Sequence, residues 1–66
     1  MEHSATEYLK RKSTETLVFF LQQCLNEGLW QNYAHMIPEI FEILRRRDIR
    51  IPAPIVLAWE SFLKTK

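Results

Sequence analysis

The residues best suited to bind a charged ligand are four arginines, Arg45, Arg46, Arg47 and Arg50. Guanidinium groups hold phosphate oxygens through paired hydrogen bonds, so this group could contact phosphates or nucleic acid. A structural explanation competes with that reading. Glu42 precedes Arg45 and Arg46 at the spacing of ion pairs within a helix, and arginine at a helix C-terminus complements the helix dipole. The sequence favours a solvated helix end and keeps phosphate contact as the alternative.

Two histidines each precede a glutamate by four residues, His3 before Glu7 and His35 before Glu39. A metal site needs three or four ligands, and two separated pairs do not supply zinc-finger or metalloprotease spacing. We therefore expect surface hydrogen bonds and no metal site. The single cysteine, Cys24, falls in an apolar helical stripe with nothing basic one turn away, which predicts a buried structural thiol.

The acidic side chains are predicted to lie on polar helix faces or in loops. A general acid or base needs a cleft that shifts its pKa, and a chain of this size seldom encloses one. We expect no enzymatic activity and no cofactor. The carboxylates concerned are Glu15, Glu27, Glu39, Glu42, Asp48 and Glu60.

The elements that position these residues are predicted to be helices, because apolar side chains recur at helical spacing and no strand pattern competes. Main helices are expected near residues 14–27, 30–46 and 54–64, after a short leading helical segment and a frayed terminus at 1–4. Short connections between such helices predict an all-α fold, a small three-helix bundle forming a single domain over 1–66. Its expected aromatic core is Trp30, Tyr33, Phe41, Trp59 and Phe62.

The first main helix has a well-marked end and an ambiguous start. Gly28, the only glycine, is followed by Leu29, which is typical of a left-handed helix cap with a hydrophobic contact. Ser4 and Ser13 both offer plausible N-terminal signals. The leading segment therefore either breaks near Ser13 or continues directly into the main helix.

Pro38 interrupts the second main helix. The apolar face from Trp30 to Leu44 keeps its phase across the proline, which projects to the opposite side. The alternative is a new helix with Pro38 at its first position, but Ile37 would then be the cap and has no side-chain oxygen for the free amides. The sequence predicts one helix over 30–46, kinked at Pro38 and ending near Arg47.

The last helix is expected to follow a proline-containing connection at 48–54, with Pro54 in its first turn. Its predicted core face consists of Ile55, Val56, Ala58, Trp59, Phe62 and Leu63.

Two large apolar side chains fall on otherwise polar helix faces. Phe19, within the apolar run 17–21, lies at roughly 200° from the first residue of that run, and Leu57 is misplaced by a similar angle in the last helix. Phe19 could be covered by Tyr8 or Leu9, and Leu57 by the preceding loop. Otherwise these side chains belong to an interface.

Charge and cysteine content narrow the classes of function. Nine Lys and Arg against eight Asp and Glu give a net charge of +1, which supplies no overall field for nucleic acid or an anionic membrane. One cysteine excludes an internal disulfide, and the longest apolar run is too short for a signal sequence or a membrane span. We expect a cytoplasmic protein without membrane contact.

These observations lead to two functional hypotheses. The first is a small intracellular helical protein-interaction module that forms a homodimer or docks on a larger protein through Phe19, Leu57 and Tyr8. The alternative is a small nucleic-acid-binding regulator that uses the segment from Arg45 to Arg50.

Overall fold

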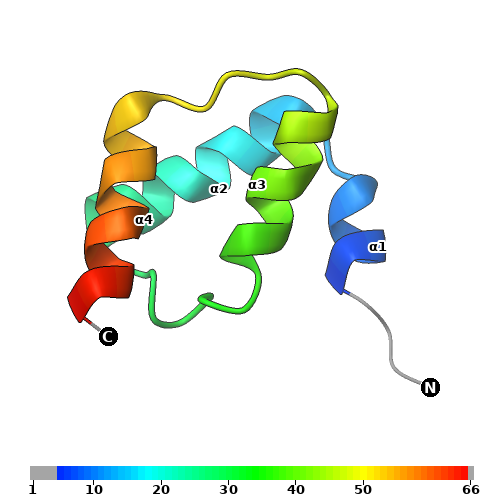
Figure 1. Ribbon diagram of the computed structural model, residues 1–66. Coiled ribbons are helices and arrows are strands. Elements are labelled where there is room, and N and C mark those ends of the chain that lie inside the picture. The colour runs from blue at the N-terminus through cyan, green and yellow to red at the C-terminus, as the bar shows by residue number, and fades with distance from the viewer. Residues whose placement is uncertain (1–4, 66) are drawn as a thin grey trace.

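The computed structural model describes residues 5–65, which form four helices and contain no strand (Figure 1). The helices are α1 (Ala5–Lys10), α2 (Thr14–Glu27), α3 (Ile37–Arg46) and α4 (Ala53–Thr65). The all-α class is confirmed, with three main helices and a short leading one. The expected fraying of 1–4 lies outside the described residues.

The ends of α2 follow from its capping residues. Ser13 is extended, with φ −71° and ψ 160°, and its Oγ accepts a hydrogen bond from the Thr16 backbone N–H at 3.1 Å. This cap separates α2 from α1, so the chain breaks at Ser13 instead of forming one continuous helix. At the other end Gly28 is left-handed with φ 64°, and the Leu29 N–H donates to the Cys24 carbonyl at 3.1 Å.

The prediction of one kinked helix over 30–46 is wrong, because α3 begins at Ile37. The preceding residues form successive turns, in which the Tyr33 N–H donates to the Trp30 carbonyl at 3.2 Å and the Met36 N–H to the Tyr33 carbonyl at 2.8 Å. Such turns wind at nearly the helical angle, so the apolar periodicity persists where the α-helix does not. Pro38 then lies in the first turn of α3, where its missing N–H breaks no hydrogen bond.

The end of α3 resembles the end of α2, although no glycine is present. Asp48 is left-handed with φ 64°, and the Ile49 N–H donates to the Leu44 carbonyl at 3.0 Å. An extended connection leads to α4, whose first turn contains Pro54. The chain therefore reverses twice through a left-handed residue followed by an apolar one.

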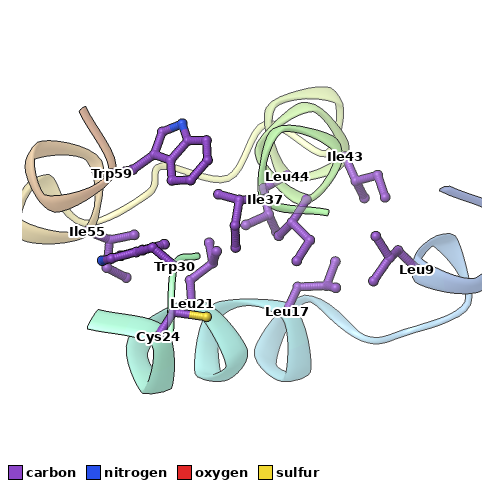
Figure 2. Packing of buried hydrophobic residues seen from close by; sticks show 11 residues of the cluster. Leu9, Leu17, Leu21, Cys24, Trp30, Ile37, Ile43, Leu44, Ile55 and Trp59 are labelled. Atoms are coloured by element: carbon purple, nitrogen blue, oxygen red, sulfur yellow. The ribbon is translucent and has the colours of Figure 1, made fainter. Parts of the chain in front are cut away.

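The core lies between α2 on one side and α3 and α4 on the other. α1 packs against α3 on the side away from α4 (Figures 1 and 2). Figure 2 shows Leu17 and Leu21 pointing from α2 towards Ile37 and Leu44, while Leu9 lies beside Ile43. The buried residues are Leu9, Leu17, Leu21, Cys24, Trp30, Ile37, Ile40, Ile43, Leu44, Ile55 and Trp59.

The aromatic residues gather mainly around Trp59. The ring centroids of Trp30, Phe41 and Phe62 lie 5.7, 6.3 and 5.5 Å from that of Trp59. Tyr33 contacts Phe20 instead, at 5.0 Å. The expected aromatic residues therefore all contribute to the core, two of them buried and three at its edge.

Candidate functional site

Three large apolar side chains that the sequence singles out are exposed. Phe19 on α2 and Leu57 on α4 each keep 63% of their surface in solvent, and Tyr8 on α1 keeps 60%. The alternative that Phe19 and Leu57 are covered within the chain is therefore wrong for the described residues. For Phe19 the reason is that α1 buries Leu9 against α3 and leaves Tyr8 exposed, so neither side chain covers it.

These three side chains do not converge on one depression. Tyr8 lines a depression between α1, α2 and the 29–36 segment, together with Phe20 and Tyr33. Phe19 lines a separate, shallow surface on the outer side of α2, with Val18 and Gln22. The structure thus presents apolar surface on three different helices.

The predicted core face of α4 is wrong at Leu63. Its side chain is 48% exposed, whereas Ile55 and Trp59 on the same helix are buried. Leu63 lies at the edge of the apolar stripe, near the last turn of α4, so it packs incompletely. Sequence periodicity alone does not show where the partner helices end.

Glu42 holds two of the four candidate arginines. Arg45 Nη2 lies 2.6 Å from Glu42 Oε2, and Arg46 Nε lies 3.0 Å from the same oxygen. Hydrogen bonds from Arg45 and then Arg46 hold the pKa of the Glu42 carboxyl group below its usual range. The predicted intrahelical ion pairs are therefore present, while both guanidinium groups stay largely exposed.

Arg47 points in a different direction from its neighbours. Its Nη1 donates to Thr14 Oγ1 at 3.1 Å, and its Nη2 donates to the Lys10 backbone carbonyl at 3.0 Å. One side chain thus ties the end of α3 to the last residue of α1 and the first residue of α2. Arg50, in the connection before α4, is exposed.

The remaining candidate residues form no metal-binding group. Within residues 5–65 no three His, Cys, Asp or Glu side chains gather as metal ligands would. His35 is exposed, and His3 lies outside the described part of the chain. Cys24 is completely buried, and desolvation raises the pKa of its thiol.

No helix in the described part of the chain has both the length and the apolar character needed to cross a bilayer. Comparison with known proteins gave no match: no family model, curated protein or solved structure is significantly similar to this chain.

Proposed function

We propose that this chain is a small cytoplasmic protein-interaction module that pairs with a second copy of itself through the outer face of α2. The observation that supports this most strongly is the exposure of Phe19, which has 63% of its surface in solvent on the side of α2 opposite the core. Isolated exposed apolar residues are common. Phe19 differs because Val18 beside it is also partly exposed and lines the same surface.

The polar residues around Phe19 suit contact with an identical surface. Gln22, Gln23 and Asn26 occupy the same side of α2, and Gln22 Nε2 already donates to Asn26 Oδ1 at 3.2 Å. Amide side chains both donate and accept hydrogen bonds, so they can pair with copies of themselves across a two-fold axis. A face of like charges would instead repel its own copy, and among the described residues that line this surface only Glu15 is ionisable.

Leu57 and Tyr8 extend the proposal to neighbouring helices. Leu57 is 63% exposed on α4, a helix that packs against α2, and so offers a second apolar contact outside the α2 face. Tyr8 lies on α1, where the Lys12 ammonium group sits 4.7 Å from its ring centroid. We assign Phe19 the central position, Leu57 a supporting one and Tyr8 a peripheral one.

The area of Phe19 that the proposed dimer would bury sets the expected effect of a substitution there on dimerisation. A phenylalanine side chain contributes about 200 Å², and the exposed 63% of Phe19 corresponds to about 125 Å², or about 3 kcal/mol at 25 cal/mol per Å². A two-fold interface contains this residue twice. Phe19→Asp should therefore weaken dimerisation by at least about 100-fold, even if half of that area stays hydrated.

The test is sedimentation velocity on the purified chain over a range of concentrations, with native mass spectrometry to count the copies. We expect a dimer for the parent and a monomer for Phe19→Asp, with Leu57→Asp in between. Asn32→Asp is the matched control, because it places the same charge on an exposed turn outside α2. Circular dichroism should show unchanged helix content in all three variants.

Two results would contradict this proposal. A parent chain that stays monomeric at millimolar concentration would exclude self-association. A Phe19→Asp variant that dimerises as tightly as Asn32→Asp would show that another surface forms the contact.

A further inference from the structure

The basic residues of this chain are concentrated in two short runs. Seven of the nine Lys and Arg residues lie in 10–12 and 45–50, and only Asp48 within these runs is acidic. More than thirty residues of sequence separate the two runs. Lys64 and Lys66 at the end of the chain are the other two.

The fold joins these runs at one end of the molecule. α1 and α3 pack together with their C-terminal ends side by side, at the upper right of Figure 1. Arg47 donates to the Lys10 carbonyl at 3.0 Å, and the side chains of Lys10, Arg46 and Arg47 line one depression around Ile43. We propose that the two runs form one composite basic surface, which binds the sugar-phosphate backbone of nucleic acid.

A purely structural role does not account for this number of cations. Two helix C-termini meet here, and positive charge stabilises each of them. Arg47 already serves this purpose through its hydrogen bond to the Lys10 carbonyl. Arg45 and Arg46 are 72% and 69% exposed and share the single carboxylate of Glu42, so their combined charge is only partly neutralised.

The arrangement fits a chain of phosphates better than a single small anion. The exposed cations are spread over the end of α1, the residue after it, α3 and the connection before α4, and none lies in an enclosed pocket. These cations are Lys10, Arg11, Arg45, Arg46 and Arg50. Arginine forks match phosphate oxygens at several points along a strand, and such contacts do not distinguish bases. We therefore expect binding that is independent of nucleotide sequence.

The experiment measures fluorescence anisotropy of labelled oligonucleotides of about 20 nucleotides, as single strands and as duplexes, over a series of salt concentrations. If about 4 phosphates are contacted on the duplex, the logarithm of the affinity should fall against the logarithm of salt with a slope near −3.5, roughly 100-fold for a fourfold rise in salt.

The variants separate the composite surface from either run alone. Lys10→Ala/Arg11→Ala removes charge from the run 10–12, and Arg46→Ala/Arg50→Ala removes it from the run 45–50. Each pair should reduce the steepness of the salt slope by about 2, because about two phosphate contacts are lost. Arg47 is left unchanged because it ties α1 to α3. Lys64→Ala is the control, since the last turn of α4 lies at the opposite end of the molecule (Figure 1).

Loss of affinity in both double variants, with Lys64→Ala equal to the parent, would support the composite surface. The proposal is overturned if the parent shows no binding at low salt, or if Lys10→Ala/Arg11→Ala has no effect on affinity. It is also overturned if the chain binds vesicles of equal parts phosphatidylserine and phosphatidylcholine but neither oligonucleotide. Circular dichroism on each variant excludes unfolding as the cause.

Discussion

The ends of α2 and α3 form a natural pair for testing backbone strain. Gly28 and Asp48 both have φ 64°, and the residue after each donates its N–H to a carbonyl five positions earlier. A left-handed backbone suits glycine, whereas a side chain at Cβ crowds the neighbouring carbonyl. We predict that Gly28→Ala destabilises the chain and that Asp48→Gly stabilises it.

The change in unfolding free energy for each substitution follows from the local structure. A Cβ at Gly28 would meet no atom within 4 Å, so the cost of Gly28→Ala is purely conformational. That cost is about 1–2 kcal/mol, reduced by the smaller backbone entropy of alanine in the unfolded chain, which leaves about 1 kcal/mol. Asp48→Gly relieves similar strain and removes a negative charge from the C-terminus of α3, but adds unfolded-state entropy, which leaves a gain of about 0.5 kcal/mol.

Urea unfolding followed by circular dichroism measures these differences. With a denaturant slope of about 1 kcal/mol per molar for so small a chain, the midpoint should fall by about 1 M in Gly28→Ala and rise by about 0.5 M in Asp48→Gly. Asp48→Asn separates the two contributions, because it removes the charge and keeps the side chain. Its midpoint should lie between those of the parent and Asp48→Gly.

A fall in the midpoint of Asp48→Gly comparable to that of Gly28→Ala would refute this reasoning. The Asp48 side chain would then stabilise the fold by an interaction larger than the strain of its backbone. A Gly28→Ala midpoint equal to that of the parent would show that the left-handed turn costs an ordinary residue nothing here.

Three further predictions concern the contacts of α1, α2 and α3. Arg47→Met should destabilise the chain by about 1–2 kcal/mol and speed amide exchange in α1, because its hydrogen bonds to the end of α1 and the start of α2 are lost. Arg45→Met, the control at the exposed ion pair, should cost under about 0.5 kcal/mol. Exchange in α1 that responds equally to both variants would contradict the role of Arg47. The lowered pKa of Glu42 means that its carboxylate stabilises the fold above its unfolded pKa and ceases to do so as pH falls through the folded pKa. Glu42→Gln should therefore have a lower urea midpoint than the parent near pH 7 and an equal one in strong acid. A difference between the two midpoints that is unchanged in acid would argue against the ion pairs. Cys24 is fully buried with a raised thiol pKa, so a disulfide reagent should label it about 100-fold more slowly in the native chain than in urea; equal rates would mean that α2 opens readily.

The local features of this chain could be predicted from its sequence because they depend on neighbouring residues. Helical periodicity indicates α2 and α4 within a residue or so of their observed ends, and Gly28 ends α2 through its own backbone freedom. The ion pairs of Glu42 also follow from spacing alone, since residues three and four apart share a helix face. The exposure of Phe19 agrees with its position opposite the apolar stripe.

The start of α3 shows where periodicity misleads. The turns over 30–36 repeat at nearly the helical angle, so they keep the same residues on the apolar face while lacking the hydrogen bonds of an α-helix. The pattern of buried residues alone does not distinguish successive turns from an α-helix. The missing N–H of Pro38 distinguishes them, because it favours a place in the first turn of a helix.

What the sequence by itself determines is the helical class, the main apolar faces and the C-terminal cap of α2, because these depend on hydrogen bonds and spacing within a few residues. Only the tertiary structure decides that Leu9 and Tyr8 face in opposite senses, one into the core and one into solvent. It also decides that Arg47 reaches the Lys10 carbonyl and so brings two distant basic runs together. Those outcomes depend on how α1 packs against α3, and helix packing joins residues whose separation along the chain gives no local signal.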